Sequence, residues 1–160
     1  MTAQIPDTCV IDGQKSAIEG WSGNTDCIPS NENLGIDTIS PHTANWSGRI
    51  DHFMVYNNRL YLFKIEVNLT DSCRELLPIN ARREVLTRYD PMWLTDSNGS
   101  RTVVREYQFE YLMYDDLFIP FTGELGISYP YIDEWELPSE LNENPSSEIS
   151  TLNFIDGILQ

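Results

Sequence analysis

Few side chains in this sequence belong to the types that carry catalysis or bind metals. The only histidines are His42 and His52, and Asp51 directly precedes His52. Neighbouring residues of a strand point to opposite faces, so Asp51 and His52 are not expected to act as a catalytic pair. The three cysteines are Cys9, Cys27 and Cys73. They form no CxxC pair, which zinc sites would use, and we therefore expect no metal site.

Two adjacent carboxylates, Asp115 and Asp116, could bind a cation or act as acid and base. No calcium-loop spacing surrounds them, and a turn or an acidic surface is the better interpretation. The sequence has no Gly-rich phosphate loop, and its only lysines are Lys15 and Lys64. We therefore expect no cofactor and no catalytic residue, and the chain is not expected to be an enzyme.

Aromatic and acidic side chains are mixed in residues 129–137. Buried aromatic side chains anchor protein interfaces, and acidic side chains steer a basic partner toward its site. The expected partner-binding residues are Asp115, Asp116, Tyr129, Tyr131, Asp133, Glu134, Trp135 and Glu136. The alternative is a strand that buries Tyr131 or Trp135 and leaves the acids in water.

The charge of the chain is strongly negative and unevenly distributed. The formal net charge is −15, and residues 106–160 hold twelve acids without any Lys or Arg. This charge argues against direct binding to nucleic acids or anionic membranes, whose phosphates would repel it. It favours a basic partner, although it is equally compatible with a highly solvated surface.

Two hairpins are predicted from their turn residues. Strands on either side of Asp12-Gly13 should pair, as should residues 49–56 and 59–69 around Asn57-Asn58, because such dipeptides accept the positive φ of tight turns. A helix is predicted over residues 80–88, capped by Asn80 and ended by Asp90-Pro91. Further strands are predicted at 102–114, 117–121, 124–127 and 131–137, with a last pair in 152–160 that contains Asp156-Gly157.

These elements predict one domain over residues 1–160. Its fold is mainly β: an antiparallel sandwich or partly open barrel with at most one short helix, with α+β as the alternative. The N-terminus lacks the pattern of a signal peptide, and no apolar run approaches the ~20 residues of a membrane helix. A cytoplasmic location is therefore expected. The odd cysteine count then predicts no intrachain disulfide.

One stretch carries a resemblance. Thr43, Asn45, Trp46 and Gly48 precede a predicted strand, a polar turn and then Leu60-Tyr61-Leu62. This pattern resembles a group of uncharacterised small bacterial proteins, over about a third of the chain. Ser47 and Arg49 stand where that group tends to have Arg and Tyr. The resemblance implies a bacterial source and brings no activity, while the residues themselves predict that Trp46 is buried in the core.

Three functions remain open. The first is an acidic binding protein, such as an immunity protein for a bacterial toxin or a nucleic-acid mimic that inhibits a nuclease or DNA-binding protein. The second is a β domain that binds or converts a small molecule, with Asp115, Asp116, Asp51 or His52 in a pocket. The third is a structural subunit of a larger assembly, with the aromatic residues at a permanent interface.

Overall fold

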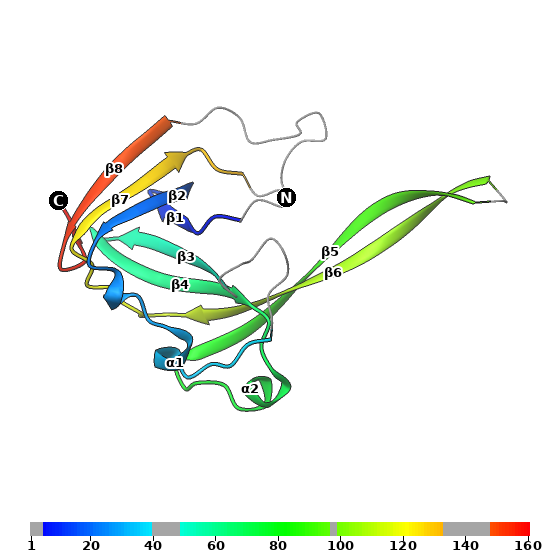
Figure 1. Ribbon diagram of the computed structural model, residues 1–160, viewed down its shortest axis with the longest axis horizontal. Helices are drawn as coiled ribbons and strands as arrows, with labels where there is room; N and C mark the ends of the chain where they lie inside the picture. The colour runs from blue at the N-terminus through cyan, green and yellow to red at the C-terminus, as the bar shows by residue number, and fades with distance from the viewer. Residues whose placement is uncertain (1–4, 40–48, 97–98, 133–147) are drawn as a thin grey trace.

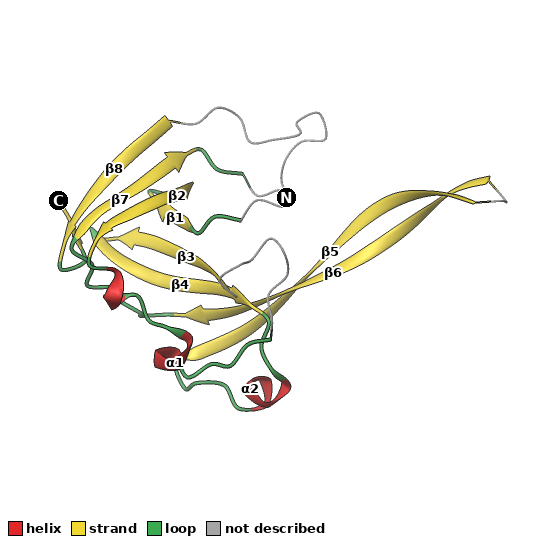
Figure 2. Cartoon of the chain, in the orientation of Figure 1, coloured by secondary structure: helices red, strands yellow, loops and turns green. Residues whose placement is uncertain are grey.

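The computed structural model describes residues 5–39, 49–96, 99–132 and 148–160, and in these segments the chain is mainly β (Figures 1 and 2). Seven strands form a closed barrel, and a long hairpin projects from it. The barrel strands are β1 (Thr8–Ile11), β2 (Gln14–Gly23), β3 (Arg49–Tyr56), β4 (Arg59–Val67), β7 (Gly123–Tyr129), β8 (Glu148–Ile155) and β9 (Ile158–Leu159). The expectation of a mainly β fold is confirmed.

The barrel closes through β4. The strand order runs β3-β1-β2-β7-β8-β9-β4, and β4 pairs with β3 to complete the ring. β1 and β3 are parallel, whereas the other neighbouring barrel strands are antiparallel. Closure leaves fewer unpaired sheet edges than an open sheet would have.

Three tight turns connect barrel strands, each with positive φ at both central residues. These angles belong to type I′ turns, whose twist matches that of the flanking strands. Both predicted hairpins are therefore confirmed, as is the turn near the C-terminus. The turn residues are Asp12-Gly13 (φ 52° and 76°), Asn57-Asn58 (φ 50° and 60°) and Asp156-Gly157 (φ 49° and 80°).

The predicted helix at residues 80–88 is wrong. This segment begins β5 (Ala81–Asp96), which pairs residue by residue with β6 (Gly99–Tyr114). A nine-residue helix has little stability of its own, while β-branched Val85 and Thr87 suit a strand and the β6 edge supplies a full hydrogen-bonding partner. Helical turns occur elsewhere, at η1 (Thr25–Cys27), α1 (Asn31–Leu34) and α2 (Asp71–Glu75).

The remaining strand predictions have mixed outcomes. Those at 102–114, 124–127 and 152–160 are confirmed within β6, β7 and the β8–β9 pair. Residues 117–121 form only one isolated bridge, between Phe118 and Tyr61, because Pro120 interrupts the segment. Tyr131 and Ile132 lie in no strand, and residues 133–137 and Trp46 lie outside the described residues.

A single apolar core fills the barrel. Phe53, Phe121 and Phe154 are almost completely buried in it, together with leucine and isoleucine side chains from β4, β6 and β7. Trp21 packs edge-to-face against Phe53 and Phe121, with ring centroids 5.1 and 4.9 Å apart. The cysteines contribute as small apolar groups: Cys9 and Cys73 are buried, and all three are free thiols.

The β5–β6 hairpin is called the arm, residues 81–114. β6 pairs with β4 only through residues 111–113, while the two strands of the arm pair with each other along their whole length. Figure 1 shows the distal part of the arm extending far from the barrel. Several described side chains of the arm are exposed, among them Tyr89, Val104 and Glu106.

Candidate functional site

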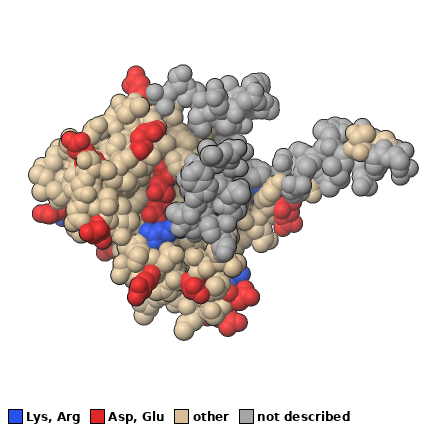
Figure 3. Space-filling model, in the orientation of Figure 1, with Lys and Arg blue, Asp and Glu red and all other residues tan. Residues whose placement is uncertain are grey.

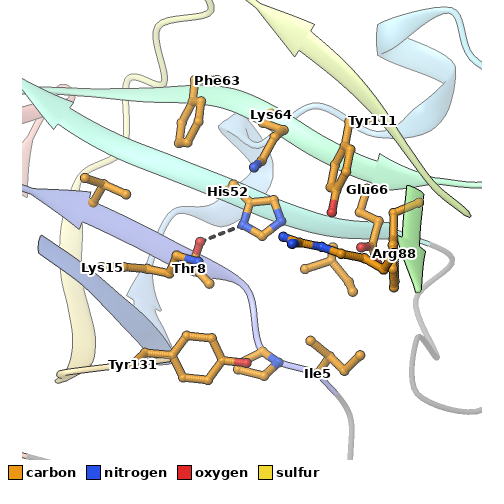
Figure 4. A pocket seen from close by; sticks show the side chains of 14 residues that line it. Ile5, Thr8, Lys15, His52, Phe63, Lys64, Glu66, Arg88, Tyr111 and Tyr131 are labelled. Carbon is orange, nitrogen blue, oxygen red and sulfur yellow. Dashed lines mark hydrogen bonds between the residues drawn. The ribbon is translucent and has the colours of Figure 1, made fainter. Parts of the chain in front are cut away.

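A pocket lies where the base of the arm meets strands β1, β3 and β4 (Figure 4). Its cavity measures about 140 Å³, several times the roughly 10–15 Å³ that one water needs on the same kind of measure. Both lysines of the chain, Lys15 and Lys64, line it with His52 and Arg88. Glu66 is the one acidic side chain among the described residues of its lining.

Strand register brings several of these side chains together. His52 of β3 pairs with Thr8 of β1 on one side and with Lys64 of β4 on the other, so the three residues form a row across the sheet. A β-bulge follows, since Phe53 pairs with Leu62 and leaves Phe63 as the extra residue of β4. Phe63 and Lys64 consequently both line the pocket.

The orientation of His52 is fixed by a buried neighbour. Its Nδ1 lies 2.6 Å from the hydroxyl oxygen of Thr8, which is 1% exposed. When Nδ1 accepts the hydroxyl proton, the neutral ring carries its own proton on Nε2. Figure 4 shows the amino group of Lys64 and the guanidinium of Arg88 pointing toward the same ring.

Aromatic rings form much of the remaining wall. The lining includes Phe63, Phe109, Tyr111 and Tyr131. The Lys64 Nζ lies 4.8 Å from the centroid of the Tyr111 ring and 5.8 Å from that of Phe63, distances at which a cation is attracted to a ring face. The pocket thus combines cationic groups with flat apolar surfaces.

Asp51 faces away from this pocket. It is buried beside Arg49, whose Nε lies 2.8 Å from Oδ1, and its backbone N–H donates to Asp7 Oδ1 at 2.8 Å. Burial raises the pKa of both carboxyls, although the positive charge of Arg49 opposes this rise. For Asp7, burial and repulsion from Asp51 raise the pKa to about 6. The expectation that Asp51 and His52 do not pair is confirmed.

The structure separates the expected partner-binding residues. Asp115 and Asp116 are exposed just after β6, where Asp115 Oδ1 lies 2.7 Å from Arg82 of the arm. Tyr129 is exposed at the end of β7, whereas Tyr131 lines the pocket at the base of the arm, which we call the basic pocket. The other predicted residues, Asp133, Glu134, Trp135 and Glu136, lie outside the described residues.

A buried carboxylate holds the base of the arm. Glu110 of β6 is 6% exposed and accepts hydrogen bonds from Arg74 Nε of α2 at 2.7 Å and Arg83 Nε of β5 at 2.5 Å. It also accepts the Leu69 amide at 2.7 Å. Burial would raise the pKa of Glu110, but these donors outweigh burial and lower it. We call this cluster the arm clasp.

From its base outward, the arm exposes large apolar side chains on both of its faces. Tyr89 is 64% exposed, Val104 is 59% exposed, and Val85 and Leu86 are also exposed. Tyr89 pairs with Glu106, and Val104 pairs with Pro91 two positions along β5, so Tyr89 and Val104 share one face of the hairpin. The exposed carboxylate of Glu106 lies on this face as well, beside the two apolar side chains.

The chain matches no protein-family model, no curated protein and no solved structure. Within the described segments, no three His, Cys, Asp or Glu side chains gather in a way that could hold a metal ion. None of the helices in those segments is long and apolar enough to cross a membrane. The geometry of the pocket, the clasp and the arm therefore carries the functional argument.

Sequence reasoning did not identify the basic pocket. The sequence shows that lysine is scarce. With a two-residue turn at Asn57-Asn58 and regular pairing, however, His52 would lie opposite Phe63, and Lys64 would point to the other face of the sheet. The bulge reverses this placement. The contribution of Arg88 could not be found either, because residues 80–88 were expected to be a helix.

Proposed function

We propose that this protein is a structural subunit of a protein assembly, and that its arm binds a second copy of the same chain. The observation that carries this proposal is the projecting hairpin with Val85, Leu86, Tyr89 and Val104 exposed. A two-stranded hairpin in water is only marginally stable by itself, and exposed apolar patches mark interaction surfaces. Contact with another chain would stabilise the arm and bury these side chains.

The charge of the arm favours a second copy as the occupant. Residues 81–114 contain five Arg and five Asp or Glu, so the arm is formally neutral while the rest of the chain carries the whole −15. A neutral arm can approach the acidic barrel of another copy without the repulsion that two acidic barrels exert on each other. In addition, β5 ends the sheet formed by the described strands, where its neighbour is β6, and we infer that a strand of that copy pairs with its other edge.

We expect the purified chain to sediment as a species larger than its 18.4 kDa monomer. The double variant Tyr89→Glu, Val104→Glu should be monomeric, because it replaces two exposed apolar side chains on one face of the arm by charges. Tyr56→Glu is the matched control: Tyr56 is 62% exposed at the end of β3 on the barrel, and its substitution should leave the assembly intact. Analytical ultracentrifugation at about 0.1 M salt would measure all three proteins.

A monomeric wild-type chain at tens of micromolar would contradict self-assembly, and so would equal dissociation by the arm and barrel substitutions. Raising the salt concentration should not dissociate the assembly, because salt screens the repulsion between two chains of net charge −15 over about 10 Å at 0.1 M.

The acidic surface supports a second candidate function, binding of a basic protein such as a toxin, nuclease or DNA-binding protein. Asp115 and Asp116 are both exposed, and Figure 3 shows acidic side chains spread over much of the face in view. Asp116→Lys should then slow association with the basic partner, while Asp12→Lys in the β1–β2 turn should not. Stopped-flow binding to a partner recovered from the native host would measure this, and equal rates for both variants would contradict the idea.

A further inference from the structure

The basic pocket gathers positive charge, although the chain as a whole is strongly negative. Acids outnumber Lys and Arg by 25 to 10, yet both lysines line this one cavity beside Arg88 and His52. A solvated surface needs no such convergence, because isolated cations remain hydrated wherever they lie. Lys15, Lys64 and Arg88 outnumber the one described carboxylate of the lining, Glu66, so the hollow has a positive local potential that attracts an anion.

The cationic groups come from elements that the fold itself brings together. Lys15 is on β2, His52 on β3, Lys64 on β4 and Arg88 on β5. The β-bulge at Phe63 turns Lys64 to the side of His52, and bulges commonly re-aim a side chain toward a site. Donors are thus directed at one volume from several directions, as Figure 4 shows for Lys64, His52 and Arg88.

The walls of the cavity favour a ligand that has an apolar ring as well as a negative charge. Phe63, Phe109 and Tyr111 supply apolar and aromatic surface around the cationic groups. A bare inorganic anion would leave this surface without a partner, whereas an anion attached to a flat ring would pack against it. The volume of about 140 Å³ suits a small ligand rather than a folded protein segment.

We propose that this pocket binds a small aromatic anion, a ring that carries a carboxylate or a phosphate. The anionic group lies among Lys15, Lys64, Arg88 and the His52 Nε2 proton, where charge-assisted hydrogen bonds hold it. The ring lies against Phe63, Phe109 and Tyr111. The pocket uses the face of the arm opposite to Tyr89 and Val104, because neighbouring residues of a strand point to opposite faces. Arg88 and Phe109 make it sensitive to how the base of the arm is held.

Isothermal titration calorimetry of the full chain with four probes would test the proposal: phenyl phosphate, benzoate, inorganic phosphate and neutral benzyl alcohol. Phenyl phosphate or benzoate should bind, and the tighter of the two identifies the anionic group. Inorganic phosphate should bind more weakly, because it lacks the ring. Benzyl alcohol should bind at least ten-fold more weakly than the better anion, because it lacks the charge.

Lys15→Gln and Lys64→Gln should each weaken binding of the better anion about ten-fold or more, as expected for loss of a hydrogen bond between charged groups. Arg59→Gln is the matched control, because it removes one positive charge at the exposed start of β4, away from the pocket lining. It should change the affinity less than two-fold. Equal effects of Lys64→Gln and Arg59→Gln would overturn the assignment.

A measurement on the wild-type chain avoids any dependence on how the variants fold. Because Lys15 and Lys64 are the only lysines, acylation followed by peptide mass spectrometry, which separates both lysines from the α-amino group, reports directly on the pocket. The better anion should slow acylation of both side chains, and benzyl alcohol should not. Absence of protection at about 10 mM of either aromatic anion would overturn the proposal, as would equal protection by benzyl alcohol.

Discussion

Glu110→Ala should lower the free energy of unfolding by about 2 to 4 kcal/mol, which is the largest loss we expect from a single substitution in the arm clasp. The substitution removes the acceptor of the buried Leu69 amide and leaves Arg74 and Arg83 without their common carboxylate. Both arginines are about one-third exposed, so water compensates part of their loss. Urea denaturation followed by tryptophan fluorescence would measure the change.

Two further variants separate the clasp from a general effect on β6. Glu110→Gln keeps an acceptor for the Leu69 amide but loses the charge, so its cost should be intermediate. Glu106→Ala removes an exposed carboxylate from the same strand and should change stability by no more than about 0.5 kcal/mol. Equal stability of Glu110→Ala and Glu106→Ala would show that the clasp does not hold the base of the arm.

The clasp also predicts how stability changes in acid. The pKa of Glu110 is lower in the folded chain than its ordinary value of 4.5. Its contribution to stability is therefore fully present above that value and is lost as the pH falls through the lowered folded pKa.

The hairpins could be predicted because their information is local. A dipeptide such as Asn57-Asn58 accepts positive φ, and bulky residues on both sides then favour pairing in one register. The closed strand order of the barrel was harder to predict from the sequence. It depends on contacts such as the parallel pairing of β1 with β3, whose paired residues lie about forty positions apart.

In the arm, pairing between β5 and β6 outweighs the local preference of residues 80–88 for a helix. Asn80 offered a cap and Glu84 a favourable first-turn charge, but these features stabilise a short helix by little. Pairing with β6 satisfies the backbone groups of β5, and the clasp fixes Arg83 on the side of Glu110. Because the paired residues of β6 lie 19 to 33 positions farther along the chain, neither interaction was visible from residues 80–88 alone.

Residues 106–160, which hold twelve acids, show that residues close in sequence need not be close in space. Glu110 is buried in the clasp, Asp115 pairs with Arg82, and Glu124 lies on β7 of the barrel. The twelve acids are therefore used in different ways, some as structural partners of arginine. The opposite holds for Lys15 and Lys64, which are distant in sequence and meet in one pocket.

Asp7→Asn should stabilise the protein at pH 7.5, by about 1 to 3 kcal/mol. Burial and the nearby Asp51 raise the pKa of Asp7 from 3.8 to about 6, so the folded chain holds a proton that the unfolded chain has already released. Between these two values the free energy of unfolding of the wild type falls as the pH rises, and above about pH 6 the full cost of the buried charge is present. Asn avoids this cost, and its Oδ1 can still accept the Asp51 amide.

Thermal or urea unfolding at several pH values would measure the effect. The difference between Asp7→Asn and the wild type should be small near pH 3.5, grow through the interval from about 4 to 6, and stay constant above it. Asp12→Asn is the matched control, because Asp12 is exposed in the β1–β2 turn and Asn tolerates its positive φ of 52° equally well. If Asp7→Asn were instead less stable than the wild type at pH 7.5, the attraction between ionised Asp7 and Arg49 would have to exceed the cost of burial. The carboxylates of Asp7 and Asp51 would then act as the partners of Arg49 at the entry to β3.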